Sequence, residues 1–288
     1  MNLLARPSLL LVAVIVAGIA IGPSRSRADD LLADTNKIES LTPEQARKLV
    51  KEFPGVQFVG KGILFFTCTD GGCLPLNGLK AVDAETAAAL AGYAKSPLLL
   101  NGLTTLSDEA AKALSQYDGG LSLDGLTVVS EEVAKKLAQH DGPLALNGLT
   151  TLSAEVAKAL AQHPERLSLN GLTTLDAEAA KALAEHKGGL GLSGLTTLSE
   201  EVAKALGKHE NTLALRGLTN LSAEAATAIA EFKGTLLLNG LTTLSDEVAK
   251  ALAGFKGEFM NLDGLTTLSD EAIKALQANP AIRLPKKL

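Results

Sequence analysis

The four histidines of this chain are the residues whose type and spacing most directly suggest chemistry. They are His140, His163, His186 and His209, which follow one another at an even interval of about 23 residues. A fold that repeats with this period would bring all four imidazoles into one file. Imidazole is a common ligand of Zn²⁺, Ni²⁺ and Cu²⁺, so the file is a candidate metal-binding array.

A second interpretation of the histidine file is the packing of flat rings. The same column holds aromatic residues in the flanking repeats, namely Tyr93, Tyr117, Phe232 and Phe255. A protonated histidine at the end of a helix would also suit the negative end of the helix dipole. Neighbouring helices pack about 8–10 Å apart, which is too far for adjacent imidazoles to share one ion without rearrangement. The metal array is kept as the alternative.

Cys68 and Cys73 form the other chemical candidate, within Thr-Cys-Thr-Asp-Gly-Gly-Cys. In an oxidising compartment, two cysteines this close across a flexible turn are expected to form a disulfide, which contributes roughly 2 kcal/mol. A zinc site needs four ligands, and the sequence nearby offers no histidine or third cysteine. The alternative is a thiol-based activity within residues 54–80, although the spacing is not Cys-x-x-Cys.

The rest of the chain carries no recognisable catalytic motif. It contains no Gly-x-Ser-x-Gly, no His-Glu-x-x-His and no phosphate-binding glycine-rich loop. The formal net charge of −5 gives no electrostatic reason to expect nucleic acid. We therefore predict a protein that is not an enzyme, needs no cofactor and binds another protein.

One repeated pattern must position all of these residues. It reads Leu-x-Leu-Asn-Gly-Leu-Thr-Thr-Leu-Ser-x-Glu-x-Ala-Lys-Ala-Leu-Ala, with a clean copy at residues 144–161. Its glycine recurs at an interval of about 23 residues, and only the first and last intervals are longer, by a single residue. A fixed period in this range is typical of a solenoid, and the repeated glycine indicates a positive φ or a close backbone approach. The glycines are Gly78, Gly102, Gly125, Gly148, Gly171, Gly194, Gly217, Gly240 and Gly264.

Each repeat predicts one short strand and one helix. Leu-x-Leu alternates with period two, so both leucines face inward and stacked copies form a parallel sheet with strands ~4.8 Å apart. A serine or aspartate then caps the helix, and a glutamate two residues later faces a lysine at helical spacing. The predicted N-caps are Asp83, Ser107, Ser130, Ser153, Asp176, Ser199, Ser222, Ser245 and Ser269.

Over residues 74–284 this pattern resembles the leucine-rich-repeat class of β/α solenoids, as found in exported bacterial proteins. One departure concerns the asparagine. Asn147 follows Leu146 directly, and Leu149 occupies the slot where that class has its asparagine. The internal asparagine ladder of the class is therefore expected to be absent or differently built. The resemblance implies a curved parallel-sheet solenoid with a binding or scaffolding role, and it transfers no catalytic residue.

The N-terminal residues 1–28 have the features of a secretory signal peptide. Arg6 precedes an apolar run at residues 9–22, and Ser26 and Ala28 fit a cleavage site. The run is shorter than the ~20 residues that span a bilayer, and an uncleaved membrane anchor is the alternative. The mature chain would lie in the periplasm or outside the cell. Cleavage removes three arginines and no acidic residue, so the net charge changes from −5 to −8.

The remaining boundaries follow from the repeat. Residues 29–73 are interpreted as a polar tail and an N-terminal cap, with a helix over residues 42–53, a β-hairpin over 56–67 and the disulfide loop. Residues 285–288 form a short basic tail. The threonine column within the repeat invites an ice-binding interpretation, but hydrogen bonds to backbone groups in a turn explain it. Deviations from the repeat are few: Val128 and Val129, Arg216 in place of asparagine, and Thr227 in place of lysine.

Overall fold

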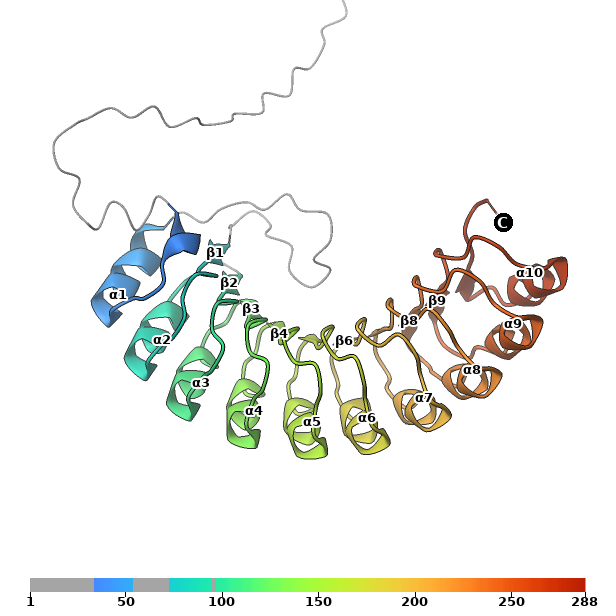
Figure 1. The fold of residues 1–288 in the computed structure, drawn as a ribbon, viewed down its shortest axis with the longest axis horizontal. Helices are drawn as coiled ribbons and strands as arrows, with labels where there is room; N and C mark the ends of the chain where they lie inside the picture. The colour runs from blue at the N-terminus through green and yellow to red at the C-terminus, as the bar shows by residue number, and fades with distance from the viewer. Residues whose placement is uncertain (1–33, 54–72, 95–96, 288) are drawn as a thin grey trace, which may run out of the picture.

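The computed structural model describes residues 34–53, 73–94 and 97–287. Across these residues, ten parallel strands alternate with ten α-helices along an arc (Figure 1). The sheet lines the concave side of the arc and the helices line the convex side. The predicted fold class is therefore confirmed: a solenoid with one short parallel strand and one helix in each repeat of about 23 residues.

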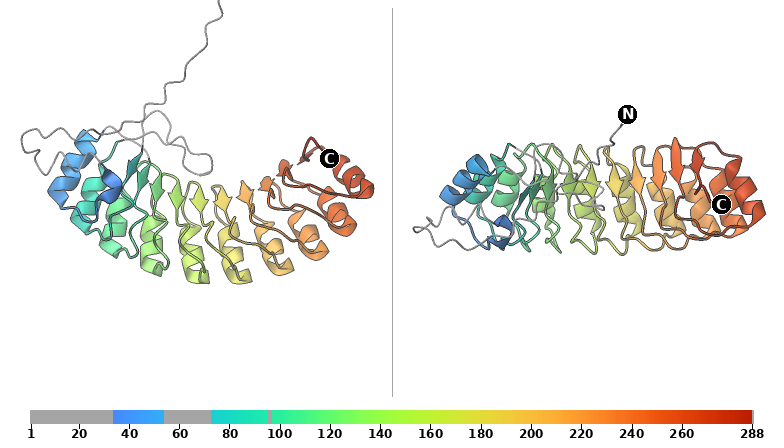
Figure 2. Two further views of the ribbon diagram at one scale, coloured as in Figure 1. Left: turned by 45° about the horizontal axis from the view of Figure 1, so that its top comes forward. Right: turned by 90° about the horizontal axis from the view of Figure 1, so that it is seen from above.

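The strands pair strictly in chain order, so each repeat adds one strand beside the last. Figure 2 shows the strands side by side along the arc. Leu121 pairs with Leu144, and Leu144 pairs with Leu167, so leucine lies on leucine along most of the array. The strands are β1 (Leu74–Pro75), β2 (Leu98–Leu99), β3 (Leu121–Ser122), β4 (Leu144–Ala145), β5 (Leu167–Ser168), β6 (Leu190–Gly191), β7 (Leu213–Ala214), β8 (Thr235–Leu237), β9 (Phe259–Asn261) and β10 (Ile282–Arg283).

The helices begin where the capping residues predicted them. In every repeat the predicted serine or aspartate accepts a hydrogen bond from the backbone N–H three residues later, as Ser153 does from Val156. The helices are α1 (Pro43–Glu52), α2 (Ala84–Ala91), α3 (Asp108–Leu114), α4 (Glu131–Leu137), α5 (Ala154–Leu160), α6 (Ala177–Ala184), α7 (Glu200–Leu206), α8 (Ala223–Ile229), α9 (Asp246–Ala253) and α10 (Asp270–Gln277).

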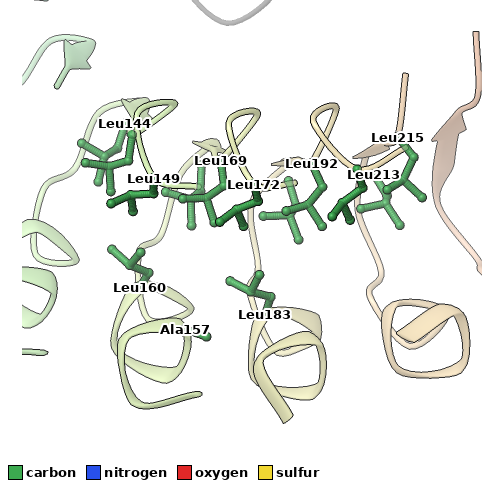
Figure 3. Close-up of a cluster of buried hydrophobic side chains, with 14 of the residues drawn as sticks. Leu144, Leu149, Ala157, Leu160, Leu169, Leu172, Leu183, Leu192, Leu213 and Leu215 are labelled. Atoms are coloured by element: carbon green, nitrogen blue, oxygen red, sulfur yellow. The ribbon is translucent and has the colours of Figure 1, made fainter. Parts of the chain in front are cut away.

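The core is a continuous band of leucines between the sheet and the helices (Figure 3). Leu144 in β4 and Leu146 just after it are both buried, and Leu160 points from helix α5 toward the sheet. In the Leu-Thr-Thr-Leu stretch that follows, the first leucine, Leu149, is buried, whereas the second, Leu152, is only half-buried. Because no repeat encloses a core alone, each unit depends on its neighbours for burial.

The regular spacing of the glycines has a steric cause. None of the nine has a φ in the left-handed range, so the positive-φ explanation is wrong at these positions. A Cβ at Gly171 would collide with the carbonyl oxygen of Asn147 in the preceding repeat. The glycine therefore allows neighbouring turns to approach closely, which was the other explanation offered.

The solenoid begins earlier than the repeat glycines indicate. A 3₁₀ helix, η2 (Thr35–Lys37), places Asn36 beside Asn77, whose backbone N–H donates to Asn36 Oδ1 at 3.3 Å. Helix α1 then packs against α2, with Thr42 and Gln45 forming a reciprocal cap. Part of the segment interpreted as a tail thus forms a further unit of the stack.

Several predictions concern residues outside the described ranges. They are the signal peptide at residues 1–28, the hairpin at residues 56–67, and the partner of Cys73, Cys68. Of the helices that the structure describes, none has the length and apolar character needed to cross a membrane.

Candidate functional site

The four histidines form one continuous stack of rings. The centroids of His140 and His163 are 6.0 Å apart, and the next two steps, to His186 and His209, are 6.1 Å each. Tyr117 and Phe232 extend the stack at its two ends, each at 6.2 Å. The rings are closer than the spacing of roughly 8–10 Å expected from helix packing. The structure thus brings all four predicted residues together as packed rings.

Burial determines the charge of these imidazoles. Each histidine is at most 2% exposed, and desolvation lowers the pKa of all four. The pKa of His163 and of His209 falls to about 4. Carbonyl groups near the rings and the carboxylate of Asp141 oppose this lowering only in part. The histidines are therefore neutral at pH 7, and the idea of a protonated histidine at each helix end is wrong.

His163 is the member of the stack with two polar contacts. Its Nδ1 lies 3.1 Å from the carbonyl oxygen of Glu165, and its Nε2 lies 3.0 Å from that of Gly142. A neutral imidazole has a single N–H, so it can donate to one of these carbonyls but not to both. The ring nitrogens of His140, His186 and His209 are also buried, and although backbone groups of the described structure lie near them, none is placed for a well-formed hydrogen bond.

A metal site on this stack gains no support from the geometry. Both nitrogens of His163 face backbone carbonyl oxygens, which would compete with a cation for the same positions. In the described ranges, no three or more His, Cys, Asp or Glu side chains are grouped so that they could hold a metal ion. The metal-array hypothesis consequently rests on the sequence spacing alone.

Of the predicted cysteine pair, the structure describes Cys73 alone. Cys73 is fully buried immediately before β1, whereas Cys68 lies outside the described residues. The described part of the chain contains no free cysteine. The disulfide therefore stays a prediction, and a thiol-based activity has nothing in the described structure to support it.

A ladder of polar side chains runs along the edge of the sheet where each strand ends. Asn101 Oδ1 accepts the backbone N–H of Asp124 at 2.9 Å, one repeat later. Asp124 Oδ1 in turn accepts that of Asn147 at 2.9 Å. Asn36, Asn77, Asn147, Asn170 and Ser193 make the equivalent contacts, which carry the ladder to Arg216. An asparagine ladder is therefore present, built directly after the strand.

Two serines that lie between the inward-facing leucines of their strands support this ladder. Ser122 donates its hydroxyl to Asn101 Oδ1, and Ser168 donates to Asn147 Oδ1, each at 2.7 Å. Both serines are buried, at 2% and 0% exposure. Their small size thus reflects packing and hydrogen bonding within the sheet surface.

The ladder stops at Arg216. Arginine has five N–H donors and no acceptor, so it cannot accept the backbone N–H of the next repeat as asparagine does. Its Nε is buried without a hydrogen-bond partner, and burial lowers the pKa of its guanidinium. In the next repeat, the Oδ1 of Asn239 is also buried without a partner. Two unpartnered polar atoms therefore occupy consecutive ladder positions.

The size of the side chains on the concave face of the sheet increases after β7. Along β3 to β7 the outward residues are Ser122, Ala145, Ser168, Gly191 and Ala214, all buried. In β8 and β9 they are Leu237 and Asn261, both half-buried. We call Arg216, Leu237, Asn239 and Asn261 the C-terminal concave strip. Sequence reasoning noted Arg216 only as a deviation. The sequence did contain a signal that Arg216 is unusual, because all the other ladder positions from Asn77 to Asp263 hold a residue with an acceptor oxygen.

The hollows on the described surface lie mainly between neighbouring helices. One of about 790 Å³ separates α4 from α5 and is lined by charged side chains such as Glu131, Lys135 and Lys158. Two of them form an ion pair, with Lys135 Nζ 2.9 Å from Glu131 Oε1. Pairs of this kind along the helices are exposed, so each stabilises its helix only weakly. Their arrangement is explained by helix stability.

Comparison with known proteins finds similarity at the level of fold alone. No protein-family model matches the chain, and no curated protein matches it. Among solved structures, TLR13 in complex with ssRNA13 is 17% identical over 72% of this chain, with a TM-score of 0.46. The chain spans 30% of the length of that protein.

Two bacterial structures cover more of the chain. A leucine-rich-repeat protein of Leptospira interrogans is 17% identical, with 86% of this chain and 87% of that protein covered and a TM-score of 0.23. An internalin of Listeria monocytogenes str. 4b F2365 is 13% identical, with coverages of 90% and 94% and a TM-score of 0.31. The assignment as a β/α repeat solenoid rests on the strands and helices of the chain itself.

Proposed function

We propose that this chain is a bacterial exported scaffold, without enzymatic activity, that binds a protein partner on its concave side. The observation that carries this proposal is the C-terminal concave strip. There a surface of small, buried side chains gives way to an arginine, a leucine and two asparagines. Arginine and larger apolar side chains in a desolvated setting are typical of the residues that dominate binding energy at protein interfaces.

The charge of the chain favours protein over nucleic acid as the partner. TLR13 is bound to RNA in its structure, but nucleic-acid binding needs a patch of basic residues. Here the net charge is −5, and the strip contains a single arginine. An isolated, partly desolvated arginine is suited to one specific anionic contact.

Export is the second part of the proposal. It rests on residues 1–28, and N-terminal sequencing of the protein recovered from cells tests it directly. We expect the mature chain to begin at Asp29 and to fractionate with the periplasm or the medium. Recovery of a chain that begins at Met1 in the cytoplasm would contradict export.

Site-specific photocrosslinking tests partner binding. A photoreactive amino acid is placed at Leu237 on the concave side and, as a control, at Lys158, which is exposed on the convex side. We expect a discrete cross-linked species from intact cells for position 237 and not for position 158. Failure to obtain such a species at position 237, or the same species from both positions, would argue against a concave binding face.

A further inference from the structure

The ladder position of Arg216 is occupied at a structural cost. From Asn36 to Ser193, each position supplies an oxygen to the backbone N–H of the next repeat. Arg216 receives such a contact from Ser193 but cannot pass one on to Asn239. Positions that break a local rule of the fold without compensation are those at which function is expected.

Arg216 has no internal partner that would explain its presence. Neither an ion pair nor a hydrogen bond links its guanidinium to another residue of the described structure, and Nε is inaccessible to solvent. Arg216 as a whole is half-buried, so its charge is partly desolvated, and an anion beside it would compensate that cost. Two charged groups that line the same edge farther along, Asp263 and Arg283, pair with each other at 3.0 Å. Asp263 is thus already engaged.

Asn239 supplies a complementary feature one repeat later. Its Nδ2 donates to Asn261 Oδ1 at 2.9 Å, which fixes the amide and leaves its own Oδ1 buried without a donor. A ligand that satisfied both orphaned atoms would present an acceptor to Arg216 and an N–H donor to Asn239. A peptide with an acidic side chain offers both groups within a few residues.

Leu237 provides the apolar contact beside these polar atoms. It is half-buried on the concave side of β8, at the position where β3 to β7 hold serine, alanine or glycine. We propose that Arg216, Asn239 and Leu237 together bind an acidic peptide segment of a protein partner. Because Arg216 Nε and Asn239 Oδ1 are closed off from solvent in the free chain, the two side chains shift when the peptide binds. The carboxylate then lies on the guanidinium fork of Arg216, and a peptide N–H donates to Asn239 Oδ1. This inference rests on the proposed function, since it names the chemistry by which the concave side recognises its partner.

Calorimetric titration with short peptides tests the inference. The probes are acetyl-hexaglutamate amide and, as an uncharged control, acetyl-hexaglutamine amide, each at low ionic strength. We expect the purified protein to bind hexaglutamate and not hexaglutamine. The R216N variant restores the common ladder residue and should bind hexaglutamate at least about tenfold more weakly. The R216K variant keeps the charge but loses the bidentate fork, so its binding should be intermediate.

Thermal unfolding of the R216N variant distinguishes a loss of binding from a loss of folding. Because R216N supplies an acceptor for the next repeat, its Tm should rise by about 2–4 °C as ligand binding falls. A variant that is more stable yet binds less cannot owe the loss of binding to misfolding. Equal hexaglutamate affinity in the native protein and R216N, or no binding by the native protein, would overturn the inference.

A third probe separates peptide from nucleic acid. Single-stranded hexathymidylate carries phosphates in place of carboxylates, and we expect it to bind more weakly than hexaglutamate. Preferential binding of hexathymidylate through Arg216 would overturn the assignment to an acidic peptide. If crosslinking at position 237 captures a partner that R216N captures equally, this inference fails while the proposed function stands. If nothing is captured at position 237, the proposed function itself fails.

Discussion

His186 and His209 lie face to face, with ring centroids 6.1 Å apart and planes only 2° from parallel. Both rings are buried, and no group of the described structure is placed for a well-formed hydrogen bond to their nitrogens. Because one repeat contributes each ring, the repeat spacing sets this distance. Two protonated imidazoles at such a separation, shielded from water, would repel each other, so the stack is stable only while it is neutral.

The stack predicts a loss of stability in mild acid. In the unfolded chain a histidine titrates near pH 6.5, whereas in the fold the pKa of His163 and of His209 is about 4. A lowered folded pKa contributes stability that is fully present above about pH 6.5 and is lost as pH falls toward about 4. Each such histidine accounts for up to about 3 kcal/mol. Urea unfolding at pH 7.5, 6, 5 and 4 measures this loss of stability. A free energy of unfolding that stays constant down to pH 4.5 would contradict the prediction.

Replacing one histidine by phenylalanine separates this effect from general acid unfolding. Phe232 occupies the same column, so the H163F variant has a ring type that the stack already accommodates. We expect H163F to be more stable than the native protein at pH 5 and within about 1 kcal/mol of it at pH 7.5. K158A, an exposed substitution on α5, serves as the control and should not change the pH dependence. An unchanged pH profile in H163F would exclude His163 as the source.

Local sequence signals predicted the helices and the core. The side-chain oxygen of Ser153 caps a helix through a contact three residues away, so a short stretch of sequence contains both partners. Likewise, the alternation of Leu144 and Leu146 determines which side chains point into the leucine core.

Features that depend on contact between repeats could not be predicted in detail. The role of Asn147 depends on how the next turn approaches it, and the charge of His163 depends on burial by several repeats. The first unit was missed for a related reason. Asn36, Ile38 and Leu41 follow the repeat order, but Lys37 replaces the glycine that marked the register. No described unit precedes residue 34, so no described carbonyl requires a glycine there.

The polar ladder predicts a specific stability loss in its interior. Asn170 Oδ1 accepts the backbone N–H of Ser193 at 2.9 Å. In N170A that partly buried donor loses its protein partner, and we expect a cost of about 1–2 kcal/mol by urea unfolding. N170D keeps an acceptor, as Asp124 does in its own repeat, and should cost less than N170A. Equal losses in the two variants would show that side-chain volume, and not the hydrogen bond, determines the effect.

The close approach of neighbouring turns predicts that two glycine-to-alanine substitutions have opposite effects. In G171A the new methyl group would collide with the Asn147 carbonyl oxygen, a backbone atom that cannot move without displacing the preceding turn. We expect this variant to lose about 2–4 kcal/mol of unfolding free energy.

In G189A the nearest atoms, Arg166 Cγ and Thr212 Cβ, lie 3.7 Å from the methyl position, an ordinary contact distance. Since neither glycine has a left-handed φ, G189A should be neutral or gain about 0.4–1 kcal/mol by restricting the unfolded chain. Chemical denaturation of both variants measures the difference. A G171A variant as stable as G189A would show that the turns can separate, and the close stacking would then not be what requires glycine in the repeat.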